Sequence, residues 1–139
     1  MKACIIGASG YTGRELVKLL LEHPHIQLSA VTSRSLAGQQ VDQVIPQVTG
    51  HSEDLVFSNP TVEELSKNQE LEIFFLALPH GTAAAYAIEL LRGGKKVIDL
   101  SADFRLKSAD IYKEFYGVEH PARALLEKAQ YGLPELHQL

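Results

Sequence analysis

The sequence predicts an α/β fold in which a parallel, doubly wound β-sheet carries helices on both faces. Short apolar segments alternate with amphipathic segments along the first hundred residues, the order in which such sheets are built. Three glycines follow the first apolar segment at three-residue steps. The chain has 139 residues, 45% of them hydrophobic, which suffices for one core, so we expect residues 1–139 to form a single domain.

The first three elements are expected over 2–6, 11–23 and 26–32. The segment 2–6 is an apolar strand. The segment 11–23 is an amphipathic helix with Leu16, Val17, Leu20 and Leu21 on one face, and Pro24 ends it. The segment 26–32 alternates apolar with small or polar residues, which is typical of a strand.

Glycines and prolines interrupt the region 33–54, so we expect a loop there with one short helix near 39–44. A short strand is expected over 55–58, followed by a helix that begins at Asn59-Pro60-Thr61 and runs through Leu65. The run 73–78 is almost wholly apolar and ends at Pro79, which predicts a central strand covered on both faces.

The remaining elements follow the same alternation and then weaken. An alanine-rich helix is expected over 82–91, with Thr82 as its N-cap and the glycines 93–94 at its end. A further strand is expected over 96–100. Two short helices are expected over 109–115 and 122–127.

The glycine turn after the first strand is the main functional signal. Gly7, Gly10 and Gly13 join a strand to an amphipathic helix, but Ala8 stands where the usual dinucleotide fingerprint has its first glycine. A helix N-terminus offers free N–H groups and a positive dipole end to a phosphate. We therefore predict a diphosphate-binding turn formed by Gly7, Ser9, Gly10, Tyr11, Thr12 and Gly13; the alternative is an ordinary strand-to-helix turn.

The end of the second strand indicates which nucleotide is bound. NAD-binding folds usually place a carboxylate there for the ribose 2′-hydroxyl, but no acidic residue lies between Glu22 and Asp42. The strand ends instead in Ser33, Arg34 and Ser35. A guanidinium beside hydroxyls would bind a 2′-phosphate, so we predict NADP(H) as the cofactor. The alternative is that Arg34 is a solvated cation.

Two later loops at strand ends carry further candidates. Pro79 and His80 follow the long apolar strand, and His80 could contact the nicotinamide ribose or the diphosphate, or be a polar loop residue without a role. Ser101 and Arg105 follow the last strand and are substrate-side candidates, since Arg105 could reach a carboxylate or phosphate. We expect instead that Arg105 pairs with Asp103.

Other features of the sequence exclude several classes of function. The net charge is −4 and there is no basic run, so nucleic acid is not an expected partner. No apolar run could span a membrane, and no signal peptide is visible, so we expect a cytoplasmic protein. Cys4 is the single cysteine, which fits a reducing compartment. His23 and His25 have no metal-ligand spacing with it, so no metal site is expected, and His120 is expected at the surface.

These motifs together resemble N-acetyl-gamma-glutamyl-phosphate reductases of arginine biosynthesis, over the whole chain in order. The first stretch, 7–16, also fits aspartate-semialdehyde dehydrogenases. The later stretches separate the two families; they are 78–81, 99–106, Tyr116-Gly117 with His120, and 131–135.

The resemblance implies a fold of Rossmann type and the N-terminal NADP(H)-binding part of a two-domain, homo-oligomeric enzyme. Such an enzyme reduces an acyl phosphate, N-acetyl-glutamyl phosphate, to a semialdehyde through a cysteine thioester. The nucleophile of that family lies in a Gly-Cys-Tyr segment beyond the motif at 131–135, which this sequence does not reach.

No catalytic residue is therefore assigned in this chain, and the catalytic and dimerisation domain is expected to be absent. Cys4 lies within the first strand, where we expect it to be buried and unreactive. We expect the chain alone to bind NADPH without reducing substrate, and to self-associate through exposed apolar surface. The alternatives are a stand-alone NADP(H)-binding regulatory module, and the cofactor domain of an aspartate-semialdehyde-dehydrogenase-like enzyme.

Overall fold

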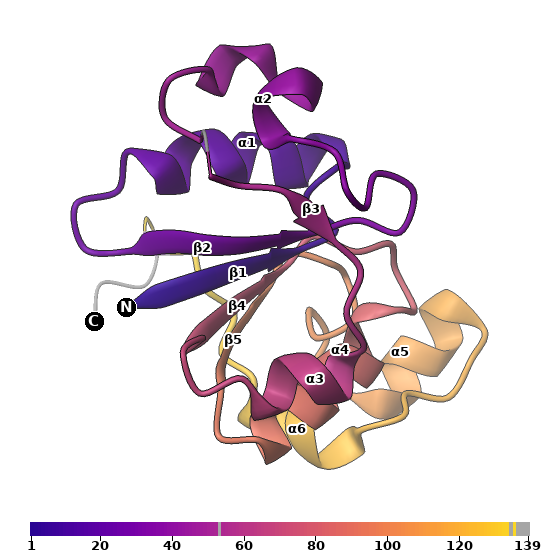
Figure 1. The fold of residues 1–139 in the computed structure, drawn as a ribbon. Coiled ribbons are helices and arrows are strands. Elements are labelled where there is room, and N and C mark those ends of the chain that lie inside the picture. Colours follow the sequence, from indigo (N-terminus) through magenta and orange to yellow (C-terminus); the bar gives the residue numbers. More distant parts are fainter. Residues whose placement is uncertain (53, 134, 136–139) are drawn as a thin grey trace.

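Five strands form one sheet in the computed structural model, which describes residues 1–52, 54–133 and 135. The sheet order is β3-β2-β1-β4-β5, and all four pairings are parallel (Figure 1). The predicted α/β doubly wound fold is confirmed. The strands are β1 (Lys2–Ile6), β2 (Gln27–Thr32), β3 (Phe57–Ser58), β4 (Ile73–Leu76) and β5 (Lys96–Asp99).

The helices cover the two faces of the sheet as separate layers. On one face lie α1 (Tyr11–Leu21) and α2 (Val41–Val44), and a short 3-10 helix (Pro46–Val48) follows α2. Figure 1 shows the other helices on the opposite side. These are α3 (Val62–Lys67), α4 (Ala83–Arg92), α5 (Ala109–Tyr116) and α6 (Arg123–Lys128).

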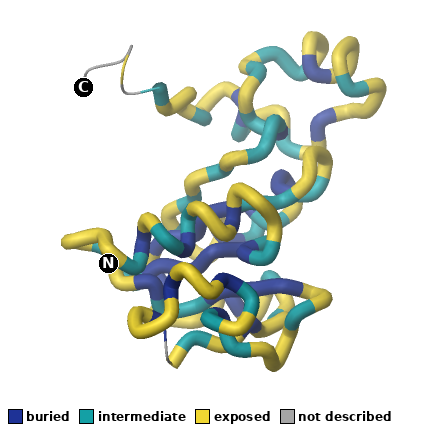
Figure 2. The backbone as a smooth tube through the Cα atoms, turned by 90° about the horizontal axis from the view of Figure 1, so that it is seen from above, coloured by how far each residue is buried: buried dark blue, intermediate teal, exposed yellow. Residues whose placement is uncertain are grey.

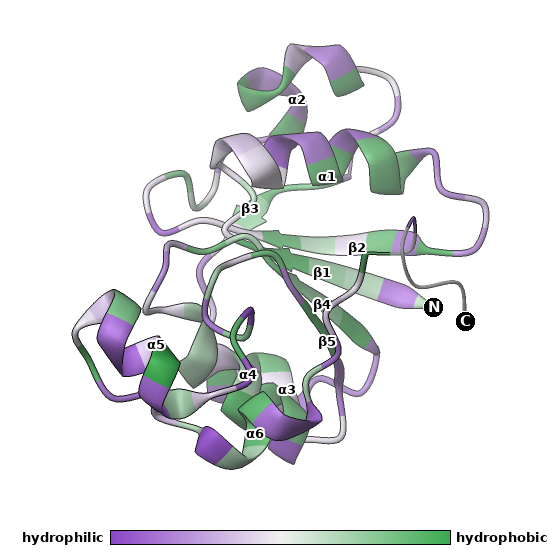
Figure 3. Cartoon of the chain, turned by 180° about the vertical axis from the view of Figure 1, so that it is seen from behind, coloured by the Kyte–Doolittle hydropathy of each residue, from purple (hydrophilic) through white to green (hydrophobic). Residues whose placement is uncertain are grey.

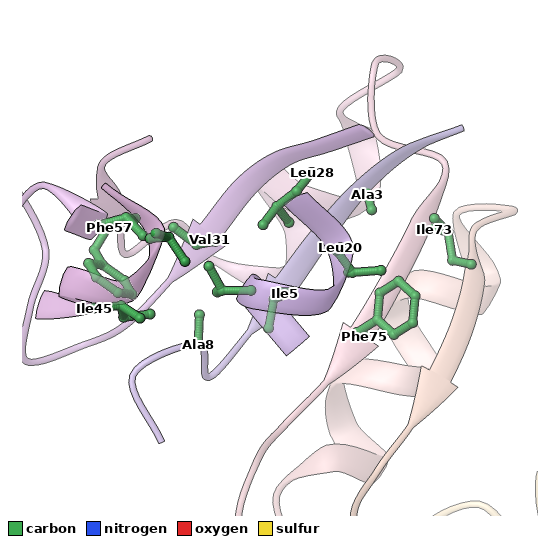
Figure 4. Close-up of a cluster of buried hydrophobic side chains, with 13 residues drawn as sticks. Ala3, Ile5, Ala8, Leu20, Leu28, Val31, Ile45, Phe57, Ile73 and Phe75 are labelled. Carbon is green, nitrogen blue, oxygen red and sulfur yellow. The ribbon is translucent and has the colours of Figure 1, made fainter. Parts of the chain in front are cut away.

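Each strand of the sheet supplies both layers of the core, because successive side chains point to opposite faces. Ala3 and Ile5 of β1 join the cluster beneath α1, whereas Cys4 and Ile6 join the cluster beneath α3 and α4. Figure 4 shows Ile5 and Leu20 together with Phe75 in the first cluster. The central strands are therefore buried on both sides (Figure 2), and the strand predicted over 73–78 owes its apolar run to this position.

The hydropathy of the residues agrees with this layered arrangement. The central strands are hydrophobic, whereas the helices and the loops around them carry hydrophilic residues (Figure 3). In the part of the chain that the structure describes, no helix is both long and apolar enough to cross a membrane.

Element boundaries differ from the predictions at a few ends, with identifiable causes. The helix expected over 11–23 ends at Leu21, and the turn before Pro24 is closed by a hydrogen bond from His23 N–H to Leu20 C=O. The strand expected over 73–78 ends at Leu76, and the backbone bond from Ala77 N–H to Ile6 C=O at 2.9 Å follows it. A Cβ on Gly7 would lie 2.4 Å from the carbonyl oxygen of Ala77, so the close approach of the two backbones beyond the strand ends requires a glycine.

The start of α3 is a capping box, which explains the predicted helix start at 59–61. The Thr61 side chain accepts from Glu64 N–H at 3.2 Å, and the Glu64 carboxylate accepts from Thr61 N–H at 2.7 Å. Residue 134 of the motif at 131–135 lies outside the described residues.

The topology leaves one obvious place for a ligand. In the sheet, β2 lies on one side of β1 and β4 lies on the other. The connections that follow β1 and β4 therefore run in opposite directions, and they separate between these two strands. Ligands of open parallel sheets bind outside the carboxyl ends of the strands at such a switch point. The turn after β1, the segment after β2 and the loop after β4 all lie at this edge.

Candidate functional site

Two of the three glycines in the turn between β1 and α1 could not be replaced by another residue without strain. Gly7 has φ +85°, in the left-handed region, and Gly13 is buried against the turn itself. A Cβ on Gly13 would lie 2.4 Å from the Gly7 carbonyl oxygen. Gly10 differs from both, because a Cβ there would meet only the Gly7 oxygen at 3.6 Å, an ordinary contact. Its missing side chain therefore leaves room for something outside the chain.

The first turn of α1 has the features of an anion-binding site. Gly10 is the N-cap, no side chain caps the helix, and no acidic residue lies in its first turn. The early N–H groups and the positive end of the dipole face the carboxyl edge of the sheet. The exposed Arg14 stabilises the turn, since its Nε donates to Ser9 C=O at 2.9 Å. Free N–H groups at a positive dipole end are suited to an anionic group such as a phosphate.

The segment after β2 joins the glycine turn through serine hydroxyls. Ser33, which is buried, donates from Oγ to Ser9 Oγ at 2.9 Å, and Ser35 Oγ lies 3.5 Å from Ser33 Oγ. The backbone adds a bond from Ala8 N–H to Thr32 C=O at 2.9 Å. Arg34 is exposed beside them, and among the described residues no carboxylate forms an ion pair with its guanidinium. The cation is thus available to a ligand.

A cleft of about 380 Å³ connects these segments. Six predicted residues line it: Gly7, Ser9, Ser33, Arg34, Ser35 and Pro79. Five others adjoin the turns without lining it: Gly10, Tyr11, Thr12, Gly13 and His80. The Tyr11 side chain is 96% exposed and therefore contacts little of the chain.

Several lining residues escaped the sequence prediction. Asn59 and Pro60 follow β3, and Thr82 and Tyr86 come from the start of α4; Ile6, Thr32, Leu65 and Leu78 complete the lining. Asn59 and Pro60 could have been found, because they follow a strand at the same edge as Arg34. A larger cavity of about 490 Å³ lies at the opposite end of the strands and is lined by Met1, residues 20–21 and 23–28, and His51. No group of metal-ligating side chains occurs in the described part of the chain.

The loop after β4 is held by a residue that the sequence analysis had paired differently. The Asp103 carboxylate is fully buried and accepts from Gly81 N–H at 2.7 Å and Ala84 N–H at 3.0 Å. Its Oδ1 also lies 3.2 Å from His80 Nδ1. The predicted pair between Asp103 and Arg105 is therefore wrong. Thr82 is the N-cap residue of α4, as predicted, but its side chain makes no capping bond. Burial of Asp103 beneath α4 removes it from the reach of Arg105.

The segment after β5 is a network of short-range bonds. Ser101 Oγ donates to Asp99 Oδ2 at 2.9 Å and accepts from Asp103 N–H at 3.1 Å. Burial raises the pKa of Asp99, although hydrogen bonds from Ser101 act in the opposite direction. Arg105 is exposed and donates to the Tyr116 hydroxyl at 3.2 Å. The Ser101 hydroxyl is thus engaged within the chain, and the Arg105 guanidinium remains accessible.

His120 is a second correction to the sequence analysis. It was expected at the surface, but only 4% of it is exposed, and its ring packs edge-on against Tyr112 with centroids 4.8 Å apart. Its Nδ1 accepts from Ala122 N–H at 3.0 Å. Burial lowers the pKa of His120, partly offset by Asp103. The ring is buried because it packs against Tyr112 of α5 and Phe104 of the segment after β5.

Cys4 lies on the inner face of β1, fully buried. This burial raises its pKa to about 12, so the thiol stays protonated, as the sequence analysis predicted. It faces the core beneath α4 and not the cleft.

Comparison with known proteins identifies relatives over nearly the whole chain. Residues 2–139 match the family model of the semialdehyde dehydrogenase NAD-binding domain. An N-acetyl-gamma-glutamyl-phosphate reductase of Desulfotalea psychrophila is 51% identical over 138 residues, covering 99% of this chain and 39% of that protein. A [LysW]-L-2-aminoadipate/[LysW]-L-glutamate phosphate reductase of Saccharolobus solfataricus is 46% identical over 137 residues, covering 99% of this chain and 38% of that protein.

Among solved structures, an aspartate semialdehyde dehydrogenase with NADP from Candida albicans superimposes with a TM-score of 0.61. It is 21% identical, and the match covers 75% of this chain and 30% of that one. This likeness supports the fold alone. The chain spans about two fifths of the length of the curated relatives that it matches.

Proposed function

The chain belongs to the family of semialdehyde dehydrogenase NAD-binding domains, and from this membership we propose that it is the NADP(H)-binding part of an N-acetyl-gamma-glutamyl-phosphate reductase. The observation that carries the proposal is 51% identity over 138 residues to a reductase of that name. The complete enzyme would reduce an acyl phosphate to a semialdehyde. The predicted motifs at 78–81 and 99–106 distinguish this reading from an aspartate-semialdehyde dehydrogenase.

The cofactor would lie across the switch point of the sheet. Gly7, Gly10 and the N-terminus of α1 would hold the diphosphate, since the turn offers free N–H groups and no competing carboxylate. Arg34, with the hydroxyls of Ser33 and Ser35, would bind the 2′-phosphate on the β2 side. Pro79 and His80 would lie on the β4 side, near the nicotinamide half.

When bound, the cofactor would supply the hydride for reduction. The residues of this chain would bind and orient it. Cys4 is buried in β1 and faces away from the cleft, so it would not supply the thiolate that the resemblance implies. Ser101 and Arg105 stay substrate-side candidates, and Arg105 is the better placed, since its guanidinium is exposed.

A second candidate function has its own support. The relative from Saccharolobus solfataricus is nearly as similar and acts on a phosphate of aminoadipate or glutamate carried by LysW, according to its name. By their names, both relatives are reductases of a phosphate substrate. The complete protein, assayed with each acyl phosphate, would separate them through the ratio of the two kcat/KM values.

Cofactor preference tests the proposal on the chain itself. Fluorescence titration should show NADPH binding more tightly than NADH. Arg34→Ala should weaken NADPH binding about tenfold and leave NADH binding almost unchanged, since only NADPH carries the 2′-phosphate. Arg92→Ala is the matched control, because Arg92 is an exposed arginine at the far end of α4 whose partner is Glu89. Equal affinities for the two cofactors, or an Arg34→Ala variant that binds NADPH normally, would contradict the assignment.

A further inference from the structure

Asp103 connects two loops that lie far apart in the sequence. It follows β5, whereas the groups it holds belong to the loop after β4 and to the first turn of α4. One carboxylate oxygen accepts from Gly81 N–H at 2.7 Å, and the other accepts from Ala84 N–H at 3.0 Å. Gly81 has φ +82°, so the bond fixes a loop residue that is in a left-handed conformation. Both bonds are charge-assisted and shielded from water, since Asp103 is 0% exposed.

The same carboxylate also orients the imidazole of His80. Its Oδ1 lies 3.2 Å from His80 Nδ1, and the Tyr116 ring stacks on the imidazole with centroids 4.1 Å apart and planes inclined by 33°. The contact with Asp103 sets the direction in which Nδ1 points, and the contact with Tyr116 sets the plane of the ring. The His80 side chain is 43% exposed, so with Nδ1 turned toward Asp103 the other nitrogen, Nε2, is the one left for a ligand.

Asp103 is itself held firmly from β5. Its N–H donates to Ser101 Oγ at 3.1 Å, and Ser101 Oγ donates to Asp99 Oδ2 at 2.9 Å. Tyr112 is almost fully buried, and this burial, together with the charge of Asp103, raises the pKa of its phenol. Residues 99, 101 and 103 are thus joined by hydrogen bonds that connect the end of β5 to the loop after β4.

We propose that Asp103 is a positioning residue for the nicotinamide half of the cofactor, acting through the Pro79–Thr82 loop and the ring of His80. The inference rests on the proposed function. β4 lies on the opposite side of β1 from β2 and Arg34. A dinucleotide whose diphosphate lies at the glycine turn and whose adenosine lies toward Arg34 must extend its other half over the β4 loop. Pro79 and Thr82 of that loop line the cleft.

The test uses Asp103→Asn and two ligands of different length. The carboxamide has the same shape but offers one acceptor oxygen where two N–H groups need one each, and its NH2 opposes the second donor. NADPH binding should weaken about tenfold. Binding of adenosine 2′,5′-bisphosphate, which lacks the nicotinamide half, should change less than about twofold. Loss of a negative charge alone would strengthen binding of both anions, so the predicted direction is opposite to a simple charge effect.

Asp110→Asn is the matched control, because Asp110 is a neighbouring aspartate whose side chain is 88% exposed. It should bind both ligands as the unmodified chain does. Amide hydrogen exchange should accelerate at Gly81 and Ala84 in Asp103→Asn and not in the control. His80→Ala should reproduce the loss for NADPH, and the double variant should lose little more, since both residues act through one ring.

Each result of these binding measurements either supports or overturns the proposed role of Asp103. Equal weakening of both ligands in Asp103→Asn would indicate a general structural role and overturn the proposal, as would unchanged NADPH binding. If Asp103→Asn does not fold, His80→Ala decides instead, because its exposed ring is not part of the core. Failure of the unmodified chain to bind either ligand would refute the proposed function itself, which is a different result from a lost preference between ligands.

Discussion

Alanine at Gly13 and alanine at Gly10 should impair the protein in two different ways, although both glycines belong to one turn. A Cβ on Gly13 would lie 2.4 Å from Gly7 O, 2.6 Å from Ala8 Cα and 2.8 Å from Ala8 C. All three are backbone atoms, so no side chain can rotate away and α1 must shift from β1. A Cβ on Gly10 would meet only Gly7 O at 3.6 Å, and its φ of −72° suits any residue.

The magnitudes follow from these distances. Overpacking costs about 1–3 kcal/mol, and three contacts with fixed atoms place Gly13→Ala at the upper end. Alanine returns up to about 1 kcal/mol of helix propensity, because Gly13 lies in the first turn of α1. The net loss of unfolding free energy is therefore about 2 kcal/mol. Gly10→Ala should cost less than about 1 kcal/mol, the difference between glycine and alanine at an N-cap.

Urea denaturation followed by circular dichroism, together with NADPH titration, separates the two variants. Gly13→Ala should lower the urea midpoint by about 1 M. Gly10→Ala should unfold almost as the unmodified chain does but bind NADPH at least about tenfold more weakly, because its methyl group occupies the approach of the diphosphate to the helix N-terminus. A Gly13→Ala variant of full stability, or a Gly10→Ala variant that binds normally, would refute this assignment of roles to the two glycines.

Two further predictions concern buried groups. The Cys4 thiol, with its pKa raised to about 12, should not react with a disulfide reagent at pH 8 in the native chain and should react rapidly in denaturant; reaction in the native state would disprove its burial. His120 binds a proton less readily folded than unfolded, since burial lowers its pKa from 6.5, so stability should be full above pH 6.5 and fall as the pH is lowered below it. Urea midpoints between pH 5 and pH 7 should show this decline, with a shallower slope for His120→Asn; identical slopes would contradict the burial of the ring.

The alternation of the sequence was sufficient to predict the sheet and the edge at which the cleft opens. Gly7, Arg34 and Pro79 each follow an apolar run, and parallel strands bring their carboxyl ends to one edge. Nothing beyond the order of strands was needed to place them near one another. Asn59 and Pro60 were missed although a strand was expected over 55–58, because they were interpreted only as the start of the next helix.

Local reasoning failed where a contact depends on which strands are neighbours. Asp103 and Arg105 are two residues apart, which favoured a pair between them. The structure instead places β5 beside β4, so Asp103 meets the N–H groups of Gly81 and Ala84, some twenty residues earlier in the chain. His120 was misplaced for the same reason, since its burial depends on Tyr112 and Phe104 packing around it.

The two halves of the cleft are therefore built by different means. On the β2 side, selectivity would depend on one exposed cation with hydroxyl neighbours, so substitution there should change which cofactor binds without disturbing the fold. On the β4 side, the loop owes its shape to a buried carboxylate that accepts from two N–H groups and lies 3.2 Å from His80 Nδ1. Because a buried unpaired carboxylate is costly, the bonds on that side stabilise the loop and the carboxylate together. The stretch 99–106 is thus best understood as the support of the loop after β4. Within this stretch, the exposed guanidinium of Arg105 is the group that remains open to a substrate.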